Sequence, residues 1–446
     1  MAATAASAAR RPNFVFIVAD DLGYADLGCY GGRDADFGPV SPVLDAMAAN
    51  GLRFTQGYSN SPVCSPTRFA LMTARWQYRL RGAAEEPINS RSRGSATLGL
   101  PPEHPTLPSL LHESGYRTAL IGKWHLGYPP HFGPLRSGYE EFFGPMSGGV
   151  DYFTHADSSG NHDLWLGEER RAEDGYLTDL ITGRAVDWIG RMSTSDAPLF
   201  LSLHYTAPHW PWETRDDRAL STRIEGSLFH LAGGNIHTYR RMIHHMDEGI
   251  GRVLDALRAA GRLDDTLVVF TSDNGGERFS DNWPLVGGKM DLTEGGIRVP
   301  YLVQWPAVIA PGGTSAQHCL TMDWSATMLD AAGVAAHPAY PLDGVSLLPV
   351  LRDPTATFAR PMCWRMNHRG QRACRDGRWK YLRVDGHDYL FDIDADERER
   401  ANRGPYEGDR LARMREQWEQ WNASMPPVPA DATVSLGYSV KDMPQR

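Results

Sequence analysis

The 446-residue chain lacks the features that mark several classes of protein. No apolar run approaches the roughly 20 residues that a membrane-spanning helix needs, so we expect no membrane partner. Acidic residues outnumber basic residues by 54 to 45, and the formal charge of −9 argues against a nucleic-acid partner. No internal repeat is apparent. These absences leave the class of globular proteins, which the 41% hydrophobic and 22% charged residues also fit.

Cysteine is scarce as well. The five cysteines are odd in number and widely spaced, and no two form a C-x-x-C pair. The sequence therefore predicts neither a disulfide framework nor a thiolate metal site. The five are Cys29, Cys64, Cys319, Cys363 and Cys374.

The N-terminus lacks the charged start and long apolar centre of a secretory signal. We interpret residues 1–11, which are rich in alanine, as a disordered leader. The absence of a signal predicts a cytoplasmic protein, with export left open.

Short apolar runs that are typical of buried strands alternate with amphipathic helical patterns. The strand-like runs cover residues 13–19, 118–121, 199–205 and 267–272. The helical patterns cover residues 41–49, 178–192 and 238–260. This alternation predicts an α/β fold with a large, mainly parallel or mixed sheet sandwiched by helices.

The pattern changes after about residue 354. Four short strand-like runs follow, with turn signals between them, at residues 362–364, 371–375, 379–384 and 389–393. A polar helix is expected over residues 409–421. We therefore predict a catalytic α/β domain over 12–354 and a small C-terminal α+β domain with an antiparallel sheet over 355–446.

Polar residues follow all four predicted strands of the large sheet, where ligands of open α/β folds bind. They are Asp20 with Asp21, Lys123 with His125, His209, and Asp273 with Asn274. Each end alone is as easily a solvated turn. Together, converging carboxylates would repel one another without a cation. Oxygen ligands without sulfur or imidazole suit Ca²⁺ or Mg²⁺ better than Zn²⁺.

Cys64 opens the run Cys64-Ser65-Pro66-Thr67-Arg68. Pro66 fits the first turn of a helix, so Cys64 is expected near a helix N-terminus, where backbone N–H groups favour an anion. A structural cysteine and a surface arginine are the ordinary alternatives for Cys64 and Arg68.

The run C-S-P-T-R resembles the C-x-P-x-R signature of the type I, formylglycine-dependent sulfatases of the alkaline-phosphatase superfamily. Further stretches follow in the order of that family, and the resemblance covers roughly residues 12–350. They are residues 13–24 (N-F-V-F-I-V-A-D-D-L-G-Y), 122–127 (G-K-W-H-L-G), 207–209 (A-P-H), 270–275 (F-T-S-D-N-G) and 287–300 (G-G-K-M-D-L-T-E-G-G-I-R-V-P). The resemblance implies an alkaline-phosphatase-like fold.

The resemblance also implies that Cys64 is converted to formylglycine by a formylglycine-generating enzyme. One hydroxyl of the hydrated aldehyde would attack the sulfur of a sulfate ester, and loss of the proton from the other would then expel sulfate. The implied cofactor is one divalent metal, Ca²⁺ by preference and Mg²⁺ as the alternative. Its implied ligands are Asp20, Asp21, Asp273, Asn274 and the modified Cys64.

Five further residues acquire roles from the resemblance. Arg68 would hold the formylglycine. Lys123 and Lys289 would bind sulfate oxygens as charge builds up. His125 would be the base of the elimination step, and His209 the acid that protonates the departing alcohol. For either histidine alone, a satisfied structural role is the ordinary alternative.

Residues on the substrate side are less clearly marked. Three tryptophans near the motifs are candidate walls for the leaving group, although such residues are often simple packing. They are Trp210, Trp212 and Trp283. Four polar residues are weaker candidates for substrate contacts: His155, Asn235, His237 and His368.

The function predicted from these residues is sulfuric ester hydrolysis on a sulfated small molecule or sugar. One alternative is a phosphonate monoester or phosphodiester hydrolase of the same superfamily, in which histidine commonly stands where this chain has Asn274. Another is a non-catalytic anion- or carbohydrate-binding protein, which predicts an unmodified Cys64 and a lost ligand. The substrate, exo or endo action and the oligomeric state stay open.

Overall fold

The computed structural model describes residues 11–84, 87–224, 228–230 and 233–430. The leader expected over 1–11 therefore lies, apart from Arg11, outside the described residues. Among those residues, none of the helices combines the length and the apolar character that a membrane crossing needs. The cytoplasmic location stays a prediction.

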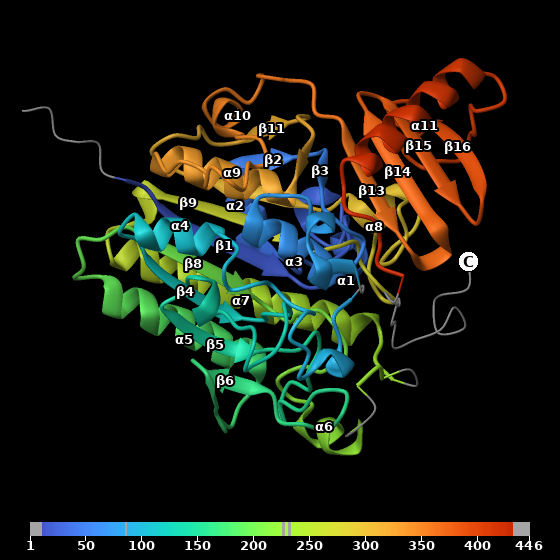
Figure 1. The fold of residues 1–446 in the computed structure, drawn as a ribbon. Helices are drawn as coiled ribbons and strands as arrows, with labels where there is room; N and C mark the ends of the chain where they lie inside the picture. The colour runs from blue at the N-terminus through green and yellow to red at the C-terminus, as the bar shows by residue number, and fades with distance from the viewer. Residues whose placement is uncertain (1–10, 85–86, 225–227, 231–232, 431–446) are drawn as a thin grey trace, which may run out of the picture.

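A ten-stranded mixed sheet runs through the centre of the described chain (Figure 1). Its strands are β1 (Asn13–Ala19), β2 (Leu52–Phe54), β4 (Arg117–Gly122), β5 (Glu141–Pro145), β6 (Leu164–Leu166), β7 (Glu169–Arg170), β8 (Leu199–His204), β9 (Thr266–Ser272), β10 (Tyr301–Gln304) and β11 (Gly313–Ser315). They lie in the order β11-β2-β10-β9-β1-β8-β4-β5-β6-β7. The neighbours from β9 to β5 are all parallel, whereas β10, β6 and β7 are antiparallel to their inner neighbours. The predicted α/β sheet is confirmed.

Helices cover both faces of this sheet (Figure 1). One face carries α3 (Cys64–Thr73), α4 (Leu107–Glu113), α9 (Thr321–Ala332) and α10 (Leu348–Arg352). The other face carries α2 (Pro42–Ala49), α5 (Leu177–Met192) and α7 (Ile236–Ala259). The three helices predicted from periodicity therefore lie together on one face.

Short elements fill the connections. They are the paired strands β3 (Gly57–Tyr58) and β12 (Cys319–Leu320), the helices α1 (Asp34–Phe37), α6 (Arg218–Ile224) and α8 (Glu294–Ile297), and 3₁₀ turns at Gly28–Tyr30, Gln77–Arg79, Arg81–Ala84, Ser90–Ser92, Leu135–Ser137, Leu263–Asp265 and His368–Gly370.

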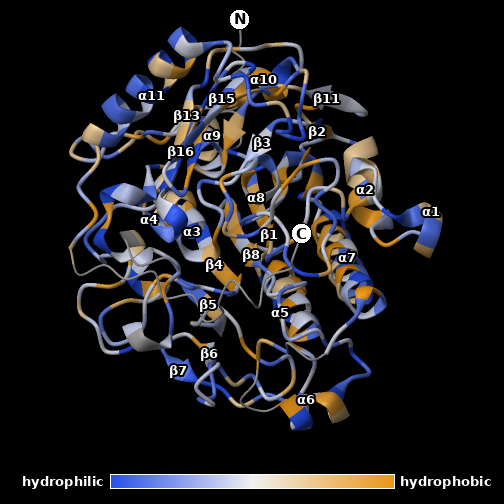
Figure 2. Ribbon diagram, turned by 90° about the vertical axis from the view of Figure 1, so that its right-hand side faces the viewer, coloured by the Kyte–Doolittle hydropathy of each residue, from blue (hydrophilic) through white to orange (hydrophobic). Residues whose placement is uncertain are grey.

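The apolar run of β1 is explained by burial on both faces. Phe14, Phe16 and Val18 pack into the core beneath α3 and α9, and the residues between them pack beneath α5 and α7. Because strand side chains alternate between faces, a strand covered on both sides has no polar position. Figure 2 shows this as hydrophobic colour along the central strands.

A separate antiparallel sheet follows the large one, at the upper right of Figure 1. Its strands, in order, are β13 (Met362–Met366), β14 (Gln371–Asp376), β15 (Trp379–Val384) and β16 (His387–Asp392). One face packs on α11 (Gly408–Ala423), with Met414 and Trp418 in that small core. The predicted meander and polar helix are confirmed, with bounds shifted by at most two residues.

One expectation about cysteine was wrong. Cys363 and Cys374 lie opposite each other on β13 and β14 and form a disulfide. Their pairing depends on the register of two strands, which cysteine spacing alone does not give. Cys29, Cys64 and Cys319 are free thiols.

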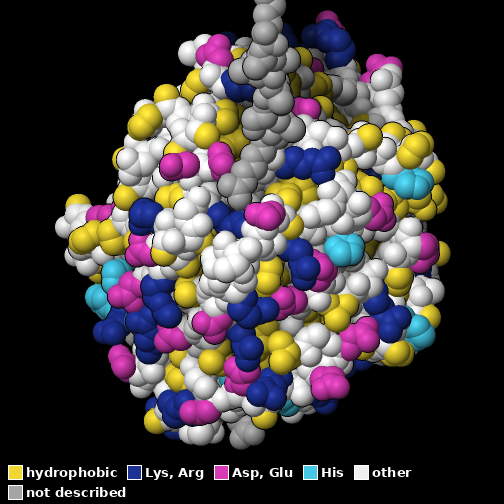
Figure 3. Space-filling model, turned by 90° about the vertical axis from the view of Figure 1, so that its left-hand side faces the viewer, with side chains coloured by type: hydrophobic (Ala, Val, Ile, Leu, Met, Phe, Trp, Pro, Cys, Tyr) yellow, Lys and Arg dark blue, Asp and Glu magenta, His cyan; other side chains and the backbone are white. Residues whose placement is uncertain are grey.

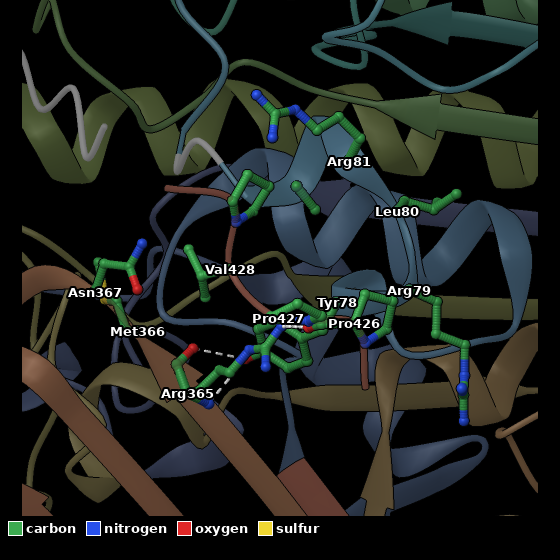
Figure 4. A pocket seen from close by; sticks show the side chains of 12 residues that line it. Tyr78, Arg79, Leu80, Arg81, Arg365, Met366, Asn367, Pro426, Pro427 and Val428 are labelled. Carbon is green, nitrogen blue, oxygen red and sulfur yellow. Dashed lines mark hydrogen bonds between the residues drawn. The ribbon is translucent and has the colours of Figure 1, made fainter. Parts of the chain in front are cut away.

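The other face of the small sheet packs against the large domain. Trp364 is fully buried there, and its Nε1 donates to the Ser59 carbonyl at 2.9 Å. Tyr78 donates to the Arg365 carbonyl at 2.8 Å. Figure 4 shows a cavity of about 280 Å³ at this junction, and none of the predicted site residues lines it.

The surface carries charges of both signs. On the face shown in Figure 3, Lys and Arg side chains lie among Asp and Glu side chains over the whole area. Ion pairs between exposed side chains of the described chain include Arg191 with Glu141 and Arg136 with Glu168.

Trp364 offers a test of the junction between the sheets. Replacing Trp364 with Ala should lower the free energy of unfolding by about 3–5 kcal/mol, because a fully buried side chain leaves a cavity and Ser59 loses a donor. The measurement is urea unfolding followed by far-UV circular dichroism. As the control, Tyr406→Ala removes a ring that is 84% exposed and should change stability by less than about 0.5 kcal/mol. Equal losses in the two variants would contradict the assignment.

Candidate active site

The carboxyl ends of the parallel strands bring the predicted polar residues together. Asp20 follows β1, Asp273 follows β9, and Lys123 follows β4. Because these strands run parallel, with β8 between β1 and β4, their ends meet at one edge of the sheet. All three side chains are at most 1% exposed. The topology thus buries a charged cluster where the fold leaves room for a ligand.

Cys64 reaches this edge from the first turn of α3 and is 2% exposed. Its Sγ lies 4.0 Å from Asp21 Oδ1. One ligand atom from each of Asp20, Asp21, Cys64 and His209 falls within 4.8 Å of the others, a grouping that can hold a metal ion. Burial raises the pKa of the Cys64 thiol well above its usual value, although Lys123 and Lys289 oppose this.

Three cations hold the carboxylates. Lys123 Nζ donates to Asp20 Oδ2 at 2.5 Å, and Lys289 Nζ donates to Asp21 Oδ2 at 2.7 Å. Arg68 donates from Nε and Nη2 to Asp273 Oδ2, at 3.0 and 2.8 Å. Each predicted cation therefore pairs with a carboxylate, and Arg68 Nη2 also lies 4.0 Å from Asp20 Oδ2.

The protonation of the carboxylates follows from these pairs. Burial by itself would raise the pKa of Asp21, but Lys289 and His209 outweigh it and lower that pKa to about 2. For Asp273, burial and the neighbouring Asp20 outweigh Arg68 and raise the pKa to about 6. The three cations match the three carboxylates in formal charge, so the raised pKa of Asp273 reflects its burial beside Asp20.

Two buried oxygens in the cluster have no hydrogen-bond partner. They are Asp20 Oδ1 and Asn274 Oδ1. Asn274 Nδ2 donates to Asp21 Oδ1 at 2.7 Å and to the Gly275 carbonyl at 2.9 Å, which fixes the amide orientation. An unsatisfied buried oxygen is costly, and hard cations bind such carboxylate and amide oxygens. The residues therefore fit a divalent cation.

His125 is held in one tautomer. Its Nε2 lies 2.5 Å from the Ile88 carbonyl, which can only accept, so Nε2 carries the proton. Its Nδ1 is buried and without a partner. Burial, with Lys123 nearby, lowers the pKa of His125 well below its usual value. The ring is therefore neutral with an open lone pair, as the predicted base requires.

His209 is oriented by the carbonyl of Trp210, which accepts from Nδ1 at 2.7 Å. Its Nε2 then faces Asp21 Oδ2 at 3.6 Å. Burial lowers the pKa of His209 to about 3, although Asp21 opposes this. Nε2 faces the cluster and is therefore the nitrogen that would exchange a proton. The role of His209 as an acid stays a prediction.

A cavity of about 280 Å³ opens above Cys64, and His125, His209 and Lys289 also line it. Sequence reasoning missed most of its polar walls, which come from loops without a motif. These are Asn89, Ser90, Tyr128, Ser147, Asp157, Ser158 and Ser159. Only Tyr128 gave a signal, because it follows His125 by three residues. Its hydroxyl is buried and without a partner.

Of the three tryptophans proposed as walls for the leaving group, one lines the cavity and two do not. Trp210 lines the cavity, but Trp212 packs against Arg278 and Phe279. Trp283 is 59% exposed, with Arg398 over its ring.

The four polar candidates do not line the cavity: His155, Asn235, His237 and His368. Asn235 instead caps α7 by accepting from the backbone N–H groups of His237 and Thr238.

Comparison with known proteins shows which family models and relatives the chain resembles. Residues 12–334 match the family model described as Sulfatase, and residues 288–417 match N-sulphoglucosamine sulphohydrolase, C-terminal. The chain is 32% identical over 373 residues to N-acetylgalactosamine-6-sulfatase of Mus musculus, covering 78% of this chain and 67% of that protein. It is 33% identical over 370 residues to arylsulfatase A of Homo sapiens, covering 77% of this chain and 68% of that protein.

A solved structure resembles the whole described chain. It is described as Ps i-CgsB in complex with k-i-k-neocarrahexaose. The TM-score is 0.81 and the sequence identity is 31%, with 92% of each chain covered. The similarity therefore includes the small C-terminal sheet as well as the large one.

Arg68 offers a test of the buried charge cluster. Replacing Arg68 with Met should lower the free energy of unfolding by about 3–5 kcal/mol, because Asp273 and Asp20 keep their buried charge without its partner. Urea unfolding measures this change. The control is Arg191→Met, which breaks the exposed pair with Glu141 and should cost about 0–1 kcal/mol. A loss at Arg68 no larger than the loss at Arg191 would show that the cluster needs no cation there.

Proposed function

We propose that this chain, which belongs to the sulfatase family and is a sulfuric ester hydrolase, removes sulfate from an otherwise neutral sugar ring. The observation that carries the reaction is the meeting of Cys64 with three buried carboxylates, two lysines and two histidines at one sheet edge. The sugar is a proposal from the walls of the cavity.

We propose that the site holds Ca²⁺, with Mg²⁺ as the second choice. Asp20, Asp21, Asp273, Asn274 and the modified Cys64 would hold the ion. When bound, the ion supplies positive charge beside the nucleophile and the transferred group. A thiol is a poor match for a hard cation, whereas an oxygen from formylglycine suits it. This mismatch supports conversion of Cys64 by a formylglycine-generating enzyme.

The remaining residues would handle the sulfate and the protons. Lys289 lines the cavity, whereas Lys123 is buried behind it against Asp20. Both would bind sulfate oxygens as negative charge grows. In the neutral ring His209 Nε2 carries no proton, so it would first take the proton that the attacking hydroxyl loses and then give it to the departing alcohol. His125 would take a proton at Nδ1.

Arg68 contacts both Asp273 and the backbone of Lys123. Its Nη1 donates to the Lys123 carbonyl at 3.0 Å while its Nε and Nη2 hold Asp273. It would therefore position both a sulfate-binding lysine and a metal ligand.

The cavity walls favour a neutral ring. Hydroxyl and amide groups dominate the described polar lining, and the carboxylate of Asp157 is neutralised by Arg93. Beyond Lys289 at the floor, no described lining residue is a cation that would balance a second anionic group. At about 280 Å³, the cavity is at the small end of ligand pockets, which span about 300–1,000 Å³, and suits one ring.

Two similar proteins support a sugar. One carries the name N-acetylgalactosamine-6-sulfatase, and the other is a structure described as a complex with k-i-k-neocarrahexaose. Both descriptions refer to carbohydrates.

The nucleophile is tested on protein from the native host. Mass spectrometry of the peptide that contains Cys64 should show formylglycine, and Cys64→Ala should release no sulfate from an aryl sulfate. Cys29→Ala, which changes a free thiol outside the site, is the control and should keep activity. An unmodified thiol in active native protein would overturn the assignment, and so would faster turnover of a phosphonate monoester than of the sulfate ester.

Tyr128 tests the sugar. Tyr128→Phe should lower kcat/KM for a singly sulfated neutral sugar about 2- to 10-fold, because one hydrogen bond of about 0.5–1.5 kcal/mol is lost, and should leave an aryl sulfate unaffected. Tyr381→Phe, whose hydroxyl donates to Asp388 in the small sheet, is the matched control. The same sugar with a ring carboxylate should react at least about tenfold more slowly than the neutral one. A preference for the carboxylate sugar would contradict the neutral-ring proposal.

A further inference from the structure

The loop that carries Lys289 is clasped by a side chain from the small C-terminal sheet. Gln371, the first residue of β14, is 2% exposed. Its Oε1 accepts from the Leu292 backbone N–H at 2.8 Å, and its Nε2 donates to the Met290 carbonyl at 2.8 Å. Nε2 also donates to the His368 carbonyl at 3.1 Å. The amide thus pairs with the loop backbone as a neighbouring strand would.

Met290 has a backbone conformation that must be held from outside. Its φ is 76°, in the left-handed region that costs a residue with a side chain roughly 1–2 kcal/mol. Its N–H donates to the Pro62 carbonyl at 2.8 Å, two residues before Cys64. The bond from Gln371 fixes the other end of the same residue. Met290 is therefore held between the nucleophile segment and the small sheet.

Lys289 comes directly before Met290, so the direction of its side chain depends on this backbone. Its N–H donates to the Gly276 carbonyl at 3.1 Å, and its Nζ reaches Asp21 Oδ2 and lines the cavity. A rotation at Met290 would move Nζ away from Asp21 and from the cavity, where it is proposed to bind sulfate oxygens.

The rest of the loop is tied to the same sheet. Glu294 is fully buried and accepts from Lys380 Nζ at 3.0 Å and from Arg375 Nη1 at 3.1 Å. Both cations belong to the small sheet, on β15 and β14. Of these contacts from the small sheet, the one made by Gln371 is nearest in sequence to Lys289, because it reaches Met290.

We propose that Gln371 is a positioning residue for sulfate ester hydrolysis, acting through Met290 on Lys289. The small sheet then contributes to catalysis without touching substrate. The inference concerns the hydrolysis itself and is independent of the sugar proposed above, so an aryl sulfate serves as the probe.

The first experiment replaces Gln371 with Met, which keeps the side-chain length and removes both hydrogen bonds to the loop together with the one to the His368 carbonyl. On an aryl sulfate, kcat should fall on the order of 10- to 100-fold, with a smaller change in KM, because a displacement of about 1 Å at a catalytic group has an effect of that size. The control is Arg372→Met, the next residue on β14, whose guanidinium lies over Trp418 on the opposite face. It should keep wild-type kcat.

A double-mutant cycle separates positioning from general damage. If Gln371 acts through Lys289, the variant with both Gln371→Met and Lys289→Ala should be no slower than Lys289→Ala alone. If the two losses multiply, or if Gln371→Met keeps wild-type kcat, the proposal is overturned. Wild-type turnover of the aryl sulfate establishes the hydrolysis independently.

Should Gln371→Met fail to fold, or should the wild type turn over no sulfate ester, two other measurements decide. Gln371→Glu keeps the acceptor for Leu292 and donates to Met290 only when protonated, so its kcat relative to wild type should rise as pH falls. Inorganic sulfate binding, measured by calorimetry, should weaken in Gln371→Glu as it does in Lys289→Ala. A pH-independent ratio with unchanged sulfate binding would refute the role of Gln371.

Discussion

Mutual repulsion among three buried carboxylates is the constraint on which the site depends. Asp20, Asp21 and Asp273 stand at the ends of adjacent strands, where parallel topology forces them together. Repulsion at such distances in a poorly solvated interior favours protonation or unfolding unless cations offset it. The fold meets this need with one cation from each of three segments: Arg68, Lys123 and Lys289. Each of these segments is held at the site by the ion pair that its cation forms with a carboxylate.

A second buried charge cluster, around Glu294, holds the loop that carries Lys289. Burial alone would raise the pKa of Glu294, but Lys380 and Arg375 outweigh burial and lower it to about 2. A buried ion pair adds little net stability, yet removing one partner is costly, so such pairs fix a geometry. This arrangement explains why a small sheet far along the chain packs against the sulfate-binding edge. The separate sheet is part of the scaffold of the active site.

The sequence predicted what depends on local pattern and strand order. The runs at 13–19 and 267–272 are mostly apolar because both faces are covered, and that pattern also marked where Asp20 and Asp273 would meet. Contacts that depend on register or on packing between distant elements were not predictable. Cys363 pairs with Cys374 through the alignment of two strands, and Gln371 reaches Met290 only because two sheets pack together. A glutamine that starts a strand carries no such signal.

The division between floor and walls has a consequence for specificity. The floor consists of strand ends and buried ion pairs, so a change there alters the reaction and the stability together. Part of the walls consists of exposed loop residues, such as Ser158 and Ser159. Substitutions on such loops usually change stability little, whereas they change what the cavity contacts. The substrate can therefore vary while the proposed chemistry at Cys64 stays fixed, which is why the motifs identify the reaction and leave the substrate to the cavity.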